Sequence, residues 1–209
     1  MKKLLVMAAL ATLVATSAFA ASGVITGSAH DLSAYSTNTN ELCVYCHTPH
    51  GGTNNAPLWN RGLADMSGYN VFDSATLNAT PTLTVGDTQL CMSCHDGAMN
   101  DALINPPAGG SPDFVALNAT FSTAANIGDD DLTNDHPVGF TYDTALATAD
   151  GELHNPATVP AVAALLFTGE MWCSSCHDVH KPGTVALSDI PFLRATNDGS
   201  ALCLTCHNK

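Results

Sequence analysis

The chain has 209 residues and carries 19 acidic against 6 basic side chains, a formal net charge of −13. This balance argues against nucleic acid as a partner, because phosphate contacts need clustered lysine and arginine. Only 6 % of the residues are aromatic and 12 % are charged, and no long periodic apolar segment follows residue 20. The polypeptide therefore has little material for a conventional core, and we expect something else to fill it.

The first twenty residues have the pattern of a secretory signal peptide. They contain two lysines, an apolar run and the small-residue ending Ala18-Phe19-Ala20, as such signals do. The apolar run is shorter than the ~20 residues that a membrane-spanning helix needs, and no later segment is apolar enough to cross a bilayer. We expect residues 1–20 to be removed, residues 21–209 to be exported, and no transmembrane span to be present.

All eight cysteines lie in four C-x-x-C pairs, each followed directly by a histidine. This is the attachment signature of a c-type haem, in which two thiols bond one porphyrin and the histidine binds its iron. Two Cys₄ zinc sites or a disulfide framework would not explain a histidine after every pair. We therefore expect four covalent haems. In chain order, motifs 1 to 4 are Cys43, Cys46 and His47; Cys91, Cys94 and His95; Cys173, Cys176 and His177; and Cys203, Cys206 and His207.

Four porphyrins in so short a chain would themselves form the hydrophobic core. The best helical window, residues 160–171, is short, and stretches such as GGTNNAP at 51–57 are rich in turn residues. We expect a multihaem cytochrome c fold with little regular secondary structure, mostly coil with short α-helices around a stacked haem chain. Closely packed haems predict electron transfer.

The exported part also contains an internal repeat. Motifs 1 and 3 are each followed by a second histidine three residues on, His50 and His180, whereas motifs 2 and 4 are not. PLWNRG at 57–62 resembles PFLRAT at 191–196 at a similar offset. The pattern predicts one tetrahaem domain over 21–209 with two related halves, about 21–110 and 130–209.

The histidines outside the motifs are candidate second axial ligands: His30, His50, His136, His154 and His180. The side chains of His50 and His180 start on the proximal side of their own haem and are too short to pass round the ring, so each should bind a different haem. By elimination, His30 and His136 serve the haems of motifs 1 and 3.

Two assignments remain for His50 and His180. In a closed version, His50 binds the haem of motif 2, His180 binds that of motif 4, and the molecule is a self-sufficient monomer. In an open version, His180 binds the haem of motif 2, and His50 binds the haem of motif 4 in another copy. Such a head-to-tail contact builds a filament unless it closes into a ring.

At these residues the chain resembles multihaem c-type cytochromes. It is most similar to the tetrahaem outer-surface cytochromes of metal-reducing bacteria that polymerise into extracellular nanowires. That resemblance implies bis-histidine haems in a continuous stack and donation of His50 to a neighbouring subunit. His154 matches no ligand motif and is taken as the spare histidine. The resemblance rests on HDLS (30–33), CVYCHTPH (43–50), NDHPVGF (134–140), CSSCHDVH (173–180) and ALCLTCHNK (201–209).

The leading functional interpretation is an extracellular or cell-surface filament subunit. It would receive electrons from partner cytochromes and deliver them to external acceptors such as metal oxides or electrodes. The alternative is a periplasmic electron shuttle with closed ligation. A multihaem reductase needs an iron with an open or displaceable axial position. Five candidate histidines for four irons leave no need for such a position, and we expect no enzymatic activity.

Overall fold

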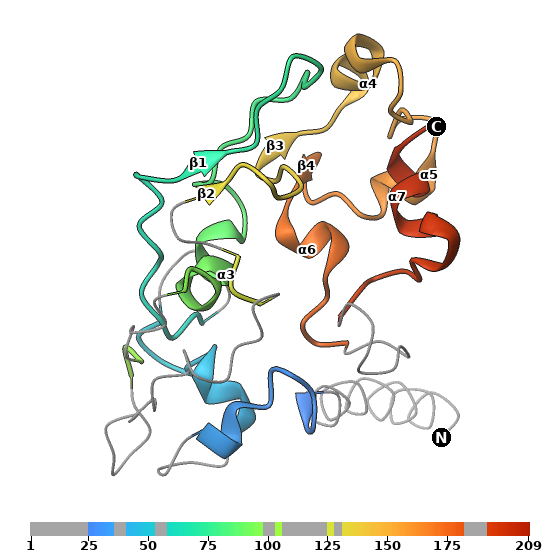
Figure 1. The fold of residues 1–209 in the computed structure, drawn as a ribbon. Helices are drawn as coiled ribbons and strands as arrows, with labels where there is room; N and C mark the ends of the chain where they lie inside the picture. Colours follow the sequence, from blue (N-terminus) through green and yellow to red (C-terminus); the bar gives the residue numbers. More distant parts are fainter. Residues whose placement is uncertain are drawn as a thin grey trace, which may run out of the picture.

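The computed structural model describes regular structure only in short elements separated by coil (Figure 1). The expected signal peptide lies outside the described residues. Within those residues, no helix is both long enough and apolar enough to span a membrane. The residues that the structure describes are 25–35, 41–52, 58–97, 103–105, 125–127, 131–181 and 192–209.

Among the described residues, the helices contain at most eight residues and the strands two, which confirms the expectation of a mostly coil chain with short helices. Strand β1 (Asn70–Val71) pairs in parallel with β2 (Asp131–Leu132), and β3 (Phe140–Thr141) pairs antiparallel with β4 (Glu170–Met171). The helices are η1 (Leu32–Tyr35), η2 (Leu42–Tyr45), α3 (Thr88–His95), α4 (Thr144–Asp150), α5 (Pro160–Ala163), α6 (Cys173–Cys176), η4 (Asp198–Ser200) and α7 (Ala201–Cys206).

The helix expected over residues 160–171 is shorter in the structure. It begins with Pro160 in the first turn, where proline is favoured, and α5 already ends at Ala163. Thr168 and Gly169 adopt positive φ angles of 53° and 84°, so the backbone reverses there. The chain then enters β4 instead of continuing the helix.

Two clusters of buried apolar side chains connect segments that are far apart in the sequence. The first includes Tyr142, Val162 and Cys206 of motif 4. The second includes Leu83 and Met92, which lies inside motif 2. The helices that carry motifs 2 and 4, α3 and α7, are therefore packed against the protein's own apolar clusters.

The segment that follows motif 1 returns to it through two backbone hydrogen bonds. The Thr48 N–H donates to the Leu58 carbonyl at 2.7 Å, and the Asn60 N–H donates to the Cys46 carbonyl at 2.8 Å. Leu58 turns the chain with a φ of 58°.

The segment that follows motif 3 repeats this arrangement. The Asp178 N–H donates to the Phe192 carbonyl at 2.7 Å, and the Arg194 N–H donates to the Cys176 carbonyl at 2.8 Å. Phe192 has a φ of 65°, matching the turn at Leu58. The similarity between PLWNRG and PFLRAT therefore corresponds to a shared local structure around motifs 1 and 3.

A close backbone contact joins the segment before α3 to the second half of the chain. The Thr82 N–H donates to the Gly139 carbonyl at 2.7 Å, and the Gly139 N–H donates to the Met171 carbonyl at 2.7 Å. Gly139 has a φ of +75°, and a Cβ added to it would lie 2.0 Å from the Thr82 carbonyl oxygen. Only glycine fits at position 139, between the backbone of Thr82 and that of Met171.

We expect Gly139→Ala to lower the free energy of unfolding by ~3 kcal/mol or more, because backbone must move to admit the methyl group. Gly151→Ala is the matched control: Gly151 also has a positive φ, of +78°, but nothing lies within 4 Å of its added Cβ. In the control, the free energy of unfolding should fall by only about 1–2 kcal/mol, because alanine is strained in the left-handed conformation. Denaturant unfolding of the two variants measures this difference, and equal losses would contradict the steric argument.

Candidate haem-binding site

Each attachment motif forms one tight turn, as its spacing predicts. Motif 1 runs through η2, motif 2 closes α3, motif 3 forms α6 and motif 4 closes α7. The N–H groups of His47, His177 and His207 donate to the carbonyl of the first cysteine of their own motif, at 2.8, 3.1 and 2.9 Å. This turn brings both sulfurs and the imidazole of a motif to the same place, which suits attachment of one porphyrin.

Three of the motif histidines lie opposite a histidine from outside the motifs. The ring centroids are 6.1 Å apart for His47 and His180, 6.1 Å for His95 and His30, and 6.3 Å for His207 and His136. An imidazole nitrogen binds a metal at about 2 Å, so two imidazoles on opposite sides of one metal ion have centroids about 6 Å apart once the ring radii are added. The three separations therefore fit two axial ligands of one iron.

Hydrogen bonds at the rings support the same role. The Nδ1 of His95 lies 2.6 Å from the Ala125 carbonyl oxygen, and the Nδ1 of His136 lies 2.9 Å from the Pro137 carbonyl oxygen. A protonated Nδ1 donating to a carbonyl leaves Nε2 with a lone pair for a metal, and metal-binding histidines commonly show this arrangement. The residues present therefore fit axial ligation of haem iron.

The observed pairs differ from those expected from the sequence. Elimination placed His30 with motif 1, but its ring lies beside His95 of motif 2 and stacks on Phe192 at 4.5 Å. Both the closed and the open version placed His180 elsewhere, whereas its ring lies beside His47 of motif 1. The elimination assumed that a ligand precedes its own motif, whereas the segment after motif 3 lies beside motif 1.

The third pair also changes the expected assignment. His136 lies beside His207 of motif 4, not with motif 3. The haem of motif 4 therefore has a candidate second ligand in its own chain, which favours a different haem as the target of His50.

Two non-motif histidines remain after these pairs are formed. His50 is exposed, and its backbone N–H and carbonyl both contact the Thr48 hydroxyl. His154 is partly buried, and its backbone N–H donates to the Cys206 carbonyl at 2.8 Å. Among the described residues, neither ring faces a motif histidine. The remaining candidate ligands for the haem of motif 3 are therefore His50 and His154.

The four motifs follow one another in space as they do in the sequence. Before haem attachment, burial raises the pKa of the Cys46 thiol to about 12, and nearby Cys94 adds to the rise. Burial likewise raises the pKa of Cys206 to about 11, and neighbouring Cys176 adds to it. Cys91 is close enough to hydrogen bond with Cys173, and this contact together with burial raises the Cys91 pKa. Motif 1 thus neighbours motif 2, motif 2 neighbours motif 3, and motif 3 neighbours motif 4.

Arg61 and Asp87 lie between neighbouring motifs and were not singled out from the sequence. Arg61 is 1 % exposed, and its Nη2 donates to the Ser93 carbonyl inside motif 2 at 3.3 Å. Asp87 directly precedes α3 and binds the backbone of motif 3. The scarcity of basic residues is the only sequence signal that could have drawn attention to Arg61.

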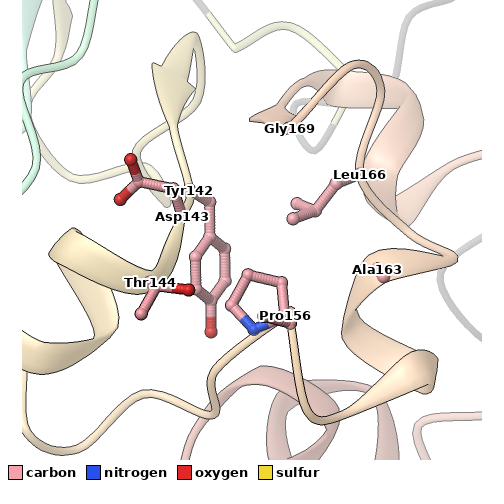
Figure 2. Close-up of a pocket in the computed structure, with 8 residues that line it drawn as sticks. Tyr142, Asp143, Thr144, Pro156, Ala163, Leu166 and Gly169 are labelled. Carbon is pink, nitrogen blue, oxygen red and sulfur yellow. The ribbon is translucent and has the colours of Figure 1, made fainter.

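A cavity of about 330 Å³ is separate from the histidine pairs. Figure 2 shows the Tyr142 ring, Pro156, Ala163 and Leu166 around it. The Tyr142 hydroxyl lies 2.8 Å from the His154 carbonyl oxygen and 3.2 Å from that of Cys206. No histidine or cysteine lines the cavity, so it is not an attachment site. Tyr142 instead connects its own segment, next to β3, to His154 and to Cys206 of motif 4.

Comparison with known proteins agrees with the chemistry of the motifs. Residues 165–209, which contain motifs 3 and 4, match the model of the doubled CXXCH motif family. No curated protein matches the chain. The family match indicates a multihaem c-type cytochrome, a class of exported electron-transfer proteins that bind haem covalently through C-x-x-C-H motifs. The short helices and predominant coil are the fold of that class.

We expect His30→Ala to remove one axial ligand from the haem of motif 2 and leave its covalent attachment intact. One haem should then change from low-spin to high-spin ferric iron in the electron paramagnetic resonance spectrum. His136→Ala is the matched positive control and should do the same for the haem of motif 4. An unchanged low-spin spectrum in His30→Ala would contradict the pairing with His95.

Acid should act on the same pair. Burial, with a smaller contribution from His95, lowers the pKa of His30 from 6.5 to about 4. The folded chain therefore keeps His30 neutral while the unfolded chain protonates it. The stability that depends on neutral His30 is complete above pH 6.5 and falls as the pH drops toward 4.

An absorbance titration of the ferric protein measures this effect. We expect the low-spin spectrum of the motif 2 haem to persist at about pH 5 and down to at least about pH 4, and to give way to a high-spin spectrum only at lower pH, because iron competes with the proton for the His30 nitrogen. His30→Ala should lack this transition. Loss of the low-spin spectrum near pH 6.5, the ordinary histidine value, would contradict the buried, neutral His30.

Proposed function

We propose that this chain carries four covalent c-type haems, each with two axial histidines, and forms a subunit of an extracellular filament that conducts electrons to external acceptors. The observation that carries the proposal is the set of three histidine pairs at 6.1–6.3 Å, after which exposed His50 and partly buried His154 are the non-motif histidines that lie beside no motif histidine among the described residues. Bound haem supplies a one-electron iron couple. The protein supplies the ligands and the spacing.

In this proposal, His50 binds the haem of motif 3 in another copy of the chain. His50 lies three residues after His47, on an exposed segment beside motif 1. A surface histidine near the first motif of one copy can reach the second half of a neighbouring copy, whereas its own chain uses His180 beside motif 1. The contact joins two different surfaces of the chain and therefore repeats from copy to copy.

The order of the motifs supports conduction along the chain. Each motif neighbours the next, from motif 1 to motif 4. Joining copies through His50 would add a contact between motif 1 of one copy and motif 3 of the next, which would connect the haems of successive copies. The acidic chain, with a net charge of −13, favours basic redox partner proteins and metal-bearing surfaces as donors and acceptors.

The competing function is a periplasmic shuttle made of single copies, in which His154 completes the iron of motif 3. His154 is less suited to this role because its backbone is already bonded to motif 4 through Cys206. With an axial histidine available for each of four irons, we propose no open iron and no enzymatic activity.

We expect His50→Ala to abolish filaments while four haems remain attached, because the variant loses only the ligand given to the next copy. Negative-stain electron microscopy of the haem-loaded protein measures assembly, and intact-protein mass spectrometry measures the haem number. The variant should also contain one high-spin haem. His154→Ala is the matched control and should retain filaments and a fully low-spin spectrum.

The reverse result would identify the shuttle. Discrete monomer-sized particles in the wild-type protein, together with a high-spin haem in His154→Ala but not in His50→Ala, would contradict the filament. That outcome would assign His154 to the haem of motif 3 within the same chain.

A further inference from the structure

Asp87 connects motif 2 to motif 3 in a way that its own helix does not require. By position it is the residue before the first turn of α3, where an aspartate normally accepts hydrogen bonds from that same helix. Its side chain makes no such bond. Instead, Oδ1 accepts from the Cys173 N–H at 3.1 Å and Oδ2 accepts from the Ser174 N–H at 3.0 Å. These two groups begin α6, 86 and 87 residues further along the chain.

The carboxylate also lies between two attachment sulfurs. One oxygen of Asp87, the Sγ of Cys91 and the Sγ of Cys173 lie within 4.8 Å of one another, and all three side chains are partly buried. These three atoms could form a metal site in a chain with free thiols. Here each sulfur belongs to a C-x-x-C-H motif and is consumed by a thioether bond, so the cluster is a contact between two haem attachments.

The backbone before Asp87 holds the carboxylate in this position. Gly86 has a φ of +66°, and a Cβ added to it would lie 2.4 Å from the indole ring of Trp172. The Trp172 N–H in turn donates to the Ser175 hydroxyl at 2.9 Å, and its indole N–H donates to Glu170 at 2.9 Å. The turn at Gly86 is therefore packed directly against Trp172, the residue that precedes α6.

We propose that Asp87 is a positioning residue for electron transfer between the haems of motifs 2 and 3, and that its charge lowers the reduction potentials of these two haems. The inference rests on the proposed function in so far as both motifs must carry haem. A negative charge stabilises the oxidised, more positive state of nearby iron. Partial burial limits the screening of that charge by salt, and charge and hydrogen bonding near a haem are recognised determinants of its potential.

The positioning role follows from the two hydrogen bonds. One carboxylate bonds two consecutive backbone N–H groups, and bonds of this charged kind are about twice as strong as neutral ones. Cys173 donates one of these hydrogen bonds and is also an attachment residue. The bonds therefore fix the start of motif 3 relative to the start of α3. The separation of the two neighbouring haems then depends in part on this side chain, together with the contact between Gly86 and Trp172.

The test is a spectroelectrochemical titration of haem-loaded Asp87→Asn, with Asp73→Asn as the control. Asp73 is exposed, and its loss changes the net charge equally. We expect two of the four one-electron steps of Asp87→Asn to move to higher potential while the other two stay near wild type. The control should shift no step selectively. Amide hydrogen exchange at residues 173 and 174 should also become faster in Asp87→Asn, because the amide cannot accept from both N–H groups.

Two further variants keep the outcome decisive. Asp87→Glu retains the charge and should keep wild-type potentials. Asp87→Ser, whose hydroxyl can accept one of the two N–H groups, replaces Asp87→Asn if that variant loads haem incompletely, with the same expected shifts. Failure of both neutral variants to load haem would reduce Asp87 to a structural residue and overturn its role in setting the potentials.

The haem count separates this inference from the proposed function. Fewer than four haems in the wild-type protein would overturn the proposed function. Four haems in Asp87→Asn with all potentials unchanged, or with a uniform shift like that of Asp73→Asn, would overturn only the role of Asp87.

Discussion

The arrangement of this molecule depends on pairs of imidazole rings whose centroids lie 6.1 to 6.3 Å apart, a separation that fits one metal ion between them. An axial ligand must approach iron along a narrow direction, so two histidines that share an iron fix the segments that carry them. In this chain the partners come from distant segments: His30 meets His95, and His180 meets His47. Each pair therefore brings together distant segments of a chain whose described helices are short and whose described strands have two residues. In the proposed bis-histidine haems, coordination to iron would replace much of the information that a conventional fold stores in its sheets and helix packing.

The protein still provides structure of its own between the motifs. The Thr82–Gly139–Met171 contact and the Gly86–Trp172 contact hold the segment before α3 against β4 and α6. Both contacts use glycines at positions where a side chain would collide with backbone or with an indole ring. These contacts join the part of the chain that carries motifs 1 and 2 to the part that carries motifs 3 and 4. Asp87 lies at this junction and combines a geometric role with an electrical one, since the same carboxylate bonds motif 3 and faces two attachment sulfurs.

The histidine pairs also connect the internal repeat to assembly. Motifs 1 and 3 share a local structure, including the left-handed turns at Leu58 and Phe192, and each is followed by a histidine three residues on. The repeat does not make these histidines equivalent, however. Both residues are exposed, but the ring of His180 lies beside His47, whereas the ring of His50 faces no motif histidine among the described residues. The same repeat position therefore contacts another motif within the chain in one half, whereas in the other half it is the residue that the proposed filament would use for a contact with another copy.

The amino-acid sequence by itself determined the attachment chemistry, because the two thiols and the proximal histidine of a haem must be neighbours in the chain. The motif spacing predicted each tight turn, and the lack of periodic apolar segments predicted the mostly coil fold. The sequence also identified the non-motif histidines as candidate ligands. Only the tertiary structure decided that His30 lies with motif 2, His180 with motif 1 and His136 with motif 4. It also redirected Asp87 from its own helix to motif 3. Attachment to one haem is a local property of a few consecutive residues, whereas the second axial ligand and the contact between neighbouring haems depend on packing between segments that no local pattern relates.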